Sequence, residues 1–349
     1  MQRAHVSCRR EGRLGRITLT REHALNALDL SMMRAMGAAL TGWLEEGDVE
    51  LVVLDSADER AFCAGGDITV VHASATGDPE IARELWRTEY ALDALIATYP
   101  IPVLVLMDGI TMGGGVGLGC HAAHRVVTER SVLAMPEVAL GLAPDVGGCL
   151  LLSRAPGEWG THLALTGARI GARDALACGL ADHFVPSNRL AALVEAVRQG
   201  GDPLGHVLGE FAQEAPRGAA DLEHHTPWID ACYAAESVEE IRARLGAYGA
   251  PAAAAAAAAL DRNSPTALKV TLRALRAAGS MTTLEECLAQ DYRLCGHFLQ
   301  GADLPEGIRA TVLDKDRRPQ WSPAELGAVT PETVDRYFQP LDVPDFRVG

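Results

Sequence analysis

The sequence of 349 residues has no uninterrupted apolar run of the ~18 to 20 residues that a membrane-spanning helix needs. Its N-terminal stretch also lacks the apolar segment of a signal peptide. Lys and Arg total 31 against 46 Asp and Glu, and only Lys269 and Lys315 are lysines. Because no block of basic residues alternates with aromatic ones, the net charge of −15 argues against a nucleic-acid partner. These absences favour a cytoplasmic protein that binds neither membrane nor nucleic acid.

Paired cysteines are absent as well. The eight cysteines stand singly, with no C-x-x-C pair and no second spacing that would complete a zinc site. Most are flanked by apolar or small residues, which is typical of buried free thiols in a reducing compartment. The chain also has no G-x-S-x-G, H-E-x-x-H or G-K-[ST] motif, and so no local signature of a lipase, a zinc protease or a P-loop. We therefore expect no metal site.

What the sequence does contain is a globular composition, 48% hydrophobic and 22% charged, with strands and helices in alternation. Residues 14–20 and 51–55 are β-branched apolar runs of strand length, and a helical stretch around 30–44 separates them. Another such run, 103–107, follows a helical segment near 80–97. The alternation predicts an α/β fold with a mostly parallel sheet covered by helices. Chemistry is then expected in the loops at the strand ends.

The pattern changes in the second half of the chain. Helical stretches dominate from about residue 187, including Pro251 with the alanines 252–259, and a capped helix that opens at Thr283. We therefore expect a boundary near residue 200, with a first part of residues 1–200 and a helical C-terminal region of residues 201–349.

Two glycine clusters stand out, Cys63-Ala-Gly-Gly-Asp67 and Met112-Gly-Gly-Gly-Val-Gly117. Each follows an apolar strand and precedes a predicted helix, where backbone N–H groups are unpaired and point outward. Two such loops facing each other would form an oxyanion hole for a thioester carbonyl oxygen. The alternative is that the glycines only permit tight turns and close packing. A dinucleotide site is excluded, because the G-x-G-x-x-G pattern would need glycine where Cys120 stands.

A second signal is a lack of cations around two carboxylates. Between Ser131 and Ser153 the only acids are Glu137 and Asp145, and no Arg, Lys or His accompanies them. Either both are turned to solvent, or both are desolvated with pKa values raised toward the range useful for acid and base catalysis. Glu89 is a third candidate, although its helix also carries charged residues typical of a solvated face.

Four segments of the sequence resemble the enoyl-CoA hydratase/isomerase (crotonase) superfamily: Ala24–Leu28 (ALNAL), Ala61–Ile68 (AFCAGGDI), Met107–Leu118 (MDGITMGGGVGL) and Met135–Gly148 (MPEVALGLAPDVGG). The likeness continues through Asn263–Lys269, the Glu285–Arg293 helix and residues 306–317, and there it is closest to the members that hydrolyse 3-hydroxyisobutyryl-CoA. The resemblance implies a spiral of ββα turns as an acyl-CoA-binding catalytic core, followed by a helical C-terminal region.

The resemblance also implies roles for individual residues. The amides of Gly66 and Gly114 would form the oxyanion hole, and Glu137 would be the principal catalytic carboxylate. Asp145 and Glu89 would complete the acyl pocket around the substrate's hydroxyl group and the attacking water. Backbone groups in two segments would receive the adenine and pantetheine portions of CoA, namely those of Ala24, Asn26, Ala64, Asp67 and Ile68.

One position separates the reactions of the superfamily. Hydratases carry a second glutamate two residues beyond the glycine triplet, and here that position is Gly117. The resemblance therefore implies hydrolysis of a short 3-hydroxyacyl-CoA thioester, chiefly 3-hydroxyisobutyryl-CoA in valine breakdown, with no cofactor beyond the CoA of the substrate. The alternatives are an enoyl-CoA or dienoyl-CoA isomerase or hydratase, or a catalytically silent acyl-CoA-binding protein. A homo-oligomer is compatible with the resemblance.

Overall fold

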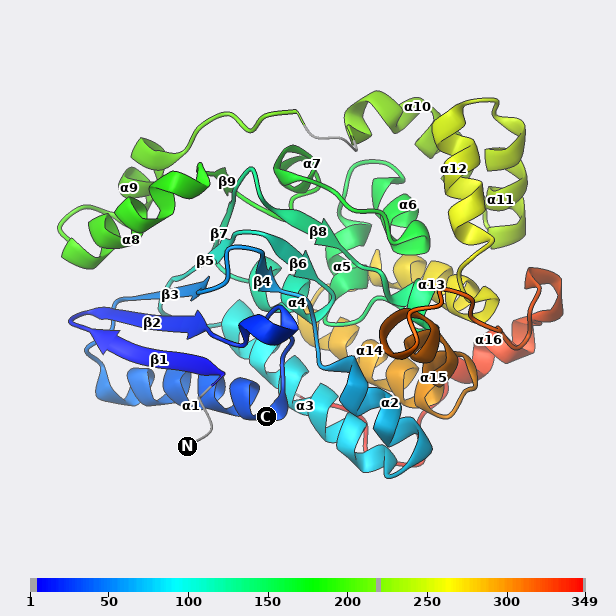
Figure 1. Ribbon diagram of the computed structural model, residues 1–349, viewed down its shortest axis with the longest axis horizontal. Helices are drawn as coiled ribbons and strands as arrows, with labels where there is room; N and C mark the ends of the chain where they lie inside the picture. Colours follow the sequence, from blue (N-terminus) through cyan, green and yellow to red (C-terminus); the bar gives the residue numbers. More distant parts are fainter. Residues whose placement is uncertain (1–4, 218–220, 348–349) are drawn as a thin grey trace. The chain divides into compact units, whose positions relative to one another are not determined.

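The computed structural model of the chain (Figure 1) describes residues 5–217 and 221–347. Packing divides it into two compact units of interleaved segments. Unit 1 comprises the described parts of Met1–Gly66, Thr88–Leu133 and Ile170–Ala220, and unit 2 those of Asp67–Arg87, Ala134–Arg169 and Asp221–Gly349. Both units draw residues from either side of position 200. The division into a catalytic core and a C-terminal region is a statement about function, and it stays a prediction.

Unit 1 is built on a six-stranded sheet. Its strands, in spatial order, are β1 (Val6–Glu11), β2 (Leu14–Leu19), β3 (Leu51–Ser56), β5 (Val103–Met107), β7 (His124–Val127) and β9 (His183–Phe184). The first two form an antiparallel hairpin, and every later neighbour pairs in parallel. This confirms the predicted strands at 14–20, 51–55 and 103–107, and the mostly parallel sheet.

A second, three-stranded sheet contains β4 (Ala61–Cys63), β6 (Ile110–Met112) and β8 (Val132–Ala134). Each of its strands directly follows a strand of the larger sheet along the chain, and a helix follows most such pairs. The chain thus repeats a ββα turn, which confirms the predicted spiral. Because β4 and β6 are parallel, the loops after them leave at the same edge of this sheet.

Helices cover the larger sheet. Helix α1 (Leu30–Glu46) begins at Asp29, whose side chain accepts the Met32 N–H, and it runs beside the β1–β2 hairpin (Figure 1). It buries an apolar stripe at helical spacing that includes Met36, Leu40 and Trp43. Helices α8 (Leu190–Gln199) and α9 (Leu204–Phe211) pack their leucines and valines against the apolar residues of β3, β5 and β7. Unit 1 also holds α4 (Gly114–Cys120) and α7 (Ala172–Ala177).

Unit 2 is mostly helical. Its helices are α2 (Ile68–Thr76), α5 (Gly148–Ser153), α6 (Trp159–Thr166), α10 (Leu222–Tyr233), α11 (Val238–Ala247), α12 (Pro251–Leu260), α13 (Pro265–Ala278), α14 (Leu284–Leu299), α15 (Asp303–Ile308) and α16 (Pro331–Tyr337). Helix α3 (Pro79–Ala97) begins in this unit and continues into unit 1. The alanine tract is the helix α12, and Thr283 opens α14 with a reciprocal capping box, so both predictions are confirmed.

Within residues 5–217 and 221–347, no helix is both long enough and apolar enough to cross a membrane. The eight cysteines are all free thiols, and all but Cys8 are buried. The burial of seven of the eight thiols agrees with what the flanking residues predict.

Candidate active site

The two glycine loops lie against each other in unit 1. They follow the parallel strands β4 and β6, whose residues Cys63 and Thr111 are in register. A Cβ atom built on Gly114 would lie 3.1 Å from the Gly66 nitrogen, and one built on Gly65 would lie 3.4 Å from the Gly114 nitrogen. The two loops are therefore adjacent, as an oxyanion hole between them would require.

Close packing leaves glycine as the only residue that fits at the start of α4. A Cβ on Gly115 would overlap the Cys63 carbonyl oxygen, so α4 meets β4 at backbone distance. Gly114 is the first residue of α4, and the N–H groups of a first turn have no acceptor within their own helix. The backbone at Gly66 and Gly114 can thus offer two N–H groups to one oxygen atom of a ligand, as an oxyanion hole requires.

Glu89 reaches both loops from α3. A Cβ on Gly114 would overlap its Oε1, and one on Gly66 would lie 3.4 Å from its Oε2. The side chain is 3% exposed, so Glu89 is not on the solvated face that the composition of its helix suggested. Asp93, one helical turn further on, is 1% exposed. Burial, together with the charges of these two acids, raises the pKa of the Cys63 thiol to about 12.

The segment after β2 pairs with the first glycine loop. Leu28 forms a parallel bridge with Gly66, and the Ala64 N–H donates to the Leu25 carbonyl at 3.0 Å. The Asn26 side chain is fully buried: its Oδ1 accepts the Arg21 N–H, and its Nδ2 donates to Ser56 and to the carbonyls of Ala61 and Phe62. Asn26 therefore braces the loop, and a ligand contact here has to come from backbone groups of the segment, as predicted for Ala24 and Ala64.

Asp67 and Ile68 open α2 in unit 2. The Asp67 carboxylate caps the helix by accepting the Thr69 N–H at 3.2 Å and the Thr69 hydroxyl at 2.5 Å. Ile68 is the first residue of the helix. Their predicted contact with the CoA chain stays a prediction.

Glu137 and Asp145 lie in unit 2, and both are buried. Glu137 opens a short 3-10 helix directly after Pro136 and is 5% exposed, while Asp145 is 7% exposed. Both lie close enough to Cys149 to affect its thiol. Burial raises the pKa of this thiol well above its ordinary value, and the negative charges of Asp291, Glu137 and Asp145 raise it further. Of the two alternatives left by the sequence, desolvation is the one observed.

Asp291 is the residue that the sequence analysis missed. It lies on α14, is 1% exposed, and its Oδ2 accepts the Gly147 N–H at 2.8 Å. Burial raises its pKa well above the ordinary value, and the charge of Asp145 adds to the shift. The available signal was a single acid between Cys287 and Cys295 at helical spacing, on what is otherwise an apolar stripe.

The two sets of predicted residues belong to different units. Gly66, Gly114 and Glu89 are brought together in unit 1, and Glu137 and Asp145 in unit 2. That both sets act on one ligand stays a prediction. Among the residues that the structure describes, no group of three or more His, Cys, Asp or Glu side chains is arranged to hold a metal ion.

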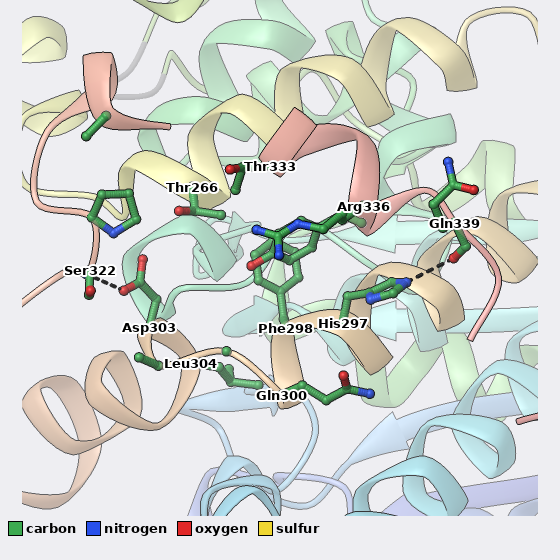
Figure 2. A pocket seen from close by; sticks show the side chains of 15 residues that line it. Thr266, His297, Phe298, Gln300, Asp303, Leu304, Ser322, Thr333, Arg336 and Gln339 are labelled. Atoms are coloured by element: carbon green, nitrogen blue, oxygen red, sulfur yellow. Dashed lines mark hydrogen bonds between the residues drawn. The ribbon is translucent and has the colours of Figure 1, made fainter. Parts of the chain in front are cut away.

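A separate pocket of about 650 Å³ opens in unit 2 among α13, α14 and α16 (Figure 2). Its lining includes Asp303, whose carboxylate accepts the Ser264 hydroxyl at 2.5 Å and the Ser322 N–H at 2.7 Å. Burial raises the pKa of Asp303. The described residues that line this pocket include none of the predicted site residues.

Comparison with known families decides what kind of protein carries this site. The model of the enoyl-CoA hydratase/isomerase family matches residues 14–338. The chain belongs to this family. Rat 3-hydroxyisobutyryl-CoA hydrolase, mitochondrial, is 40% identical over 99% of the chain and 91% of its own length, and the human protein of that name is 40% identical over 98% and 90%.

Two solved structures resemble the chain over 99% of its length. A carnitinyl-CoA dehydratase from Mycobacterium thermoresistibile is 43% identical, with a TM-score of 0.94 and 99% coverage of both chains. An enoyl-CoA hydratase from Rhodobacter sphaeroides is 45% identical, with a TM-score of 0.92 and coverage of 99% and 100%. The names of these relatives divide between hydrolysis and hydration chemistry, so the residues of the site have to separate the two reactions.

Proposed function

We propose that this member of the enoyl-CoA hydratase/isomerase family hydrolyses the CoA thioester of a short 3-hydroxy acid. The preferred substrate is 3-hydroxyisobutyryl-CoA, and the products are 3-hydroxyisobutyrate and free CoA, a step of valine breakdown. Support comes from the rat and human relatives, which carry the name of this hydrolase over nearly the whole chain. Water is the only co-reactant, so the reaction needs no cofactor beyond the CoA of the substrate.

The observation that carries the choice of reaction is the residue at position 117. Hydration of a double bond needs two proton carriers at the water, and the family resemblance places the second one at Gly117, which has no side chain. Hydrolysis needs only one activated oxygen nucleophile and a site for the oxyanion. The chain retains the groups for hydrolysis and lacks one of the two for hydration.

The first step in this proposal is polarisation of the thioester. Its carbonyl oxygen accepts the N–H groups of Gly66 and Gly114, and these bonds strengthen as the carbon becomes tetrahedral and the oxygen becomes an anion. Loss of one such donor typically costs ~2.7 to 4 kcal/mol of transition-state stabilisation. The amides belong to the backbone of two closely packed loops and need no side-chain movement to reach the oxygen.

Glu137 then supplies the nucleophile by one of two balanced routes. As a general base it takes a proton from water, the water oxygen bonds to the carbonyl carbon, and the C–S bond breaks as the proton on Glu137 passes to the CoA sulfur, which restores the carboxylate. As a nucleophile its carboxylate bonds to the carbon and expels CoA as a thiolate. Water then cleaves the mixed anhydride, which restores Glu137, and one proton of that water goes to the thiolate. In both routes Asp145 and Glu89 contact the 3-hydroxyl group and the water.

The alternative reaction is hydration or isomerisation of an unsaturated acyl-CoA. It is favoured by the names of the two solved relatives and by the Glu137 and Asp145 pair, which could move protons along an acyl chain. A catalytically silent acyl-CoA binder is less compatible with this chain. Burying a carboxylate lowers the stability of a fold, and a protein that only binds acyl-CoA has no use for buried acids. Four acids of this chain are nevertheless at least nine-tenths buried: Glu89, Glu137, Asp145 and Asp291.

A thiol-release assay with 3-hydroxyisobutyryl-CoA, 3-hydroxypropionyl-CoA and isobutyryl-CoA, run beside a crotonyl-CoA hydration assay, tests the proposal. We expect rapid CoA release from the hydroxylated substrates and negligible hydration. Glu137→Gln keeps the size of the side chain but can neither accept a proton nor attack, so we expect CoA release to fall at least about 100-fold with acyl-CoA binding retained. Turnover of crotonyl-CoA alone, or parental hydrolysis by the variant, contradicts the proposal.

A further inference from the structure

Asp291 holds the turn that carries Asp145. Its Oδ2 accepts the Gly147 N–H at 2.8 Å, two residues beyond Asp145 along the chain. Val146 and Gly147 both have left-handed backbone conformations, with φ of 52° and 74°. Such a φ is strained for a β-branched residue such as valine, so the turn persists only where its surroundings fix it. The bond from Gly147 to Asp291 is such a constraint.

The same face of α14 contacts the turn at a second point. Cys287, Asp291 and Cys295 stand four residues apart and therefore share one side of the helix. The Cys295 thiol donates to Asp145 Oδ2 at 3.7 Å, and the Cys287 thiol lies 3.8 Å from Asp291 Oδ2. Helix α14 thus contacts both the backbone of the turn and the carboxylate that the turn presents.

An ionisable group at this position needs a reason, because the carboxyl group is buried and burial raises its pKa well above the ordinary value. An apolar residue would pack here without that cost. Asp145 raises the pKa further by like charge, while the Gly147 N–H and the Cys287 thiol lower it. The feature that an acid offers, and an apolar residue lacks, is an acceptor for the Gly147 amide.

We propose that Asp291 is a positioning residue: by accepting the Gly147 N–H it fixes the turn so that Asp145 meets the 3-hydroxyl group of the substrate. This inference rests on the proposed function. It assigns to Asp291 no contact with substrate and no proton transfer. Its effect is on how strongly the enzyme prefers a hydroxylated acyl group over the same acyl group without the hydroxyl.

The test compares kcat/KM for 3-hydroxyisobutyryl-CoA with kcat/KM for isobutyryl-CoA in three variants. Asp291→Leu removes the acceptor, and we expect the preference ratio to fall at least about 10-fold, because small misplacements of a substrate-contacting group cost rates of that order. Asp291→Asn keeps an oxygen acceptor, and we expect its ratio to stay within about threefold of the parent. If Asp291→Leu does not fold, Asp291→Ser replaces it, since the serine hydroxyl is too short to reach the amide.

Gln290→Met is the matched control. Gln290 is the neighbouring buried residue on α14, and its amide donates to the Ala274 carbonyl at 3.3 Å, away from the turn. We expect this variant to lose stability but to keep the ratio. A structural role alone would lower the stability of Asp291→Leu and leave its ratio unchanged, and that result overturns the inference. A ratio that falls equally in Asp291→Asn overturns it as well.

A measurement that does not depend on activity separates this inference from the proposed function. We expect the Gly147 amide hydrogen to exchange slowly in the parent and in Asp291→Asn, and faster in Asp291→Leu. If the parent does not release CoA from 3-hydroxyacyl-CoA, the proposed function fails whatever the exchange shows. If the parent releases CoA and Gly147 exchanges equally in all variants, Asp291 does not hold the turn.

Discussion

At the scale of single residues, the candidate site depends on two positions where glycine has no side chain. Glycine at position 114 leaves room for the Glu89 carboxylate and keeps the backbone N–H groups of the two loops accessible to one oxygen atom. Under the proposed function, the same absence of a side chain at Gly117 leaves out the second proton carrier that hydration would need. In this proposal glycine permits the oxyanion site at one position and restricts the reaction at another.

Gly114→Ala tests this directly. The new Cβ would overlap Glu89 Oε1 and approach the Gly66 nitrogen to 3.1 Å, so the carboxylate or the loop has to shift. We expect kcat for thioester hydrolysis to fall about 100-fold or more, as when an oxyanion donor is lost. Gly37→Ala is the control, because nothing lies within 4 Å of its added Cβ in α1. It should keep full activity and gain about 0.5 to 1 kcal/mol of stability, and a Gly114→Ala enzyme as active as this control would contradict the role of Gly114.

At the scale of elements, the start of α14 determines where Asp291 and the two cysteines of its stripe lie. Thr283 accepts the Glu286 N–H, and Glu286 accepts the Thr283 N–H in return. Thr283→Ala removes half of this box, and we expect a loss of about 1 kcal/mol in the free energy of unfolding, measured in urea. Ser280→Ala is the control: the Ser280 hydroxyl is exposed and donates to the Ala277 carbonyl, so its loss should change stability by much less. Equal losses in the two variants would mean that the cap does not stabilise the helix.

Elements with local signals were predictable from the sequence. A capping threonine, a β-branched run of strand length and a glycine cluster after a strand all depend on neighbours within a few residues, and each was found where expected. Glu89 was harder to place, because charged neighbours such as Arg87 make its helix look solvated and only the packing shows which face is buried. Asp291 stands out in the sequence only as the single acid on an apolar stripe, and its contact with the turn could not be predicted from that. Its partner Gly147 is 144 residues away in the chain, and no local pattern reports such a contact.

At the scale of the whole molecule, stability should fall as pH is lowered because of a buried histidine. His162 lies on α6 with its Nδ1 2.9 Å from the Tyr233 hydroxyl and its ring edge-on to Trp228. Burial, helped by His225, lowers its pKa to about 4. Between that value and the ordinary ~6.5 of an unfolded chain, only the unfolded state takes up the proton, so stability is complete above pH ~6.5 and is lost as pH falls.

The size of this effect is roughly 3 kcal/mol between pH 7 and pH 4, from 1.36 kcal/mol for each unit of pKa difference. We expect urea unfolding of the parent to show this loss and His162→Gln to show less of it, since glutamine does not titrate. The quantity to compare is the difference in unfolding free energy between parent and variant at each pH, because the other titrating groups contribute equally to both proteins. A constant difference from pH 4 to pH 7 would contradict the assignment.

The titration of Asp291 should have the opposite effect on stability, lowering it as pH rises. Its folded-state pKa is raised, first by burial and then by the charge of Asp145, so above pH ~4 the unfolded chain releases a proton that the folded chain still holds. Folding is then penalised increasingly as pH rises toward the folded-state pKa. Asp291→Asn keeps an acceptor for the Gly147 amide and removes the titration, so we expect it to be more stable than the parent, with a gain that is larger at pH 8 than at pH 4. Unfolding in urea at both pH values measures this, and a variant equally stable or weaker at pH 8 would show that the buried acid carries no such cost. If Asp291→Asn is more stable than the parent, the acid at position 291 lowers the stability of the fold. Such a cost is expected where a residue serves function and not stability.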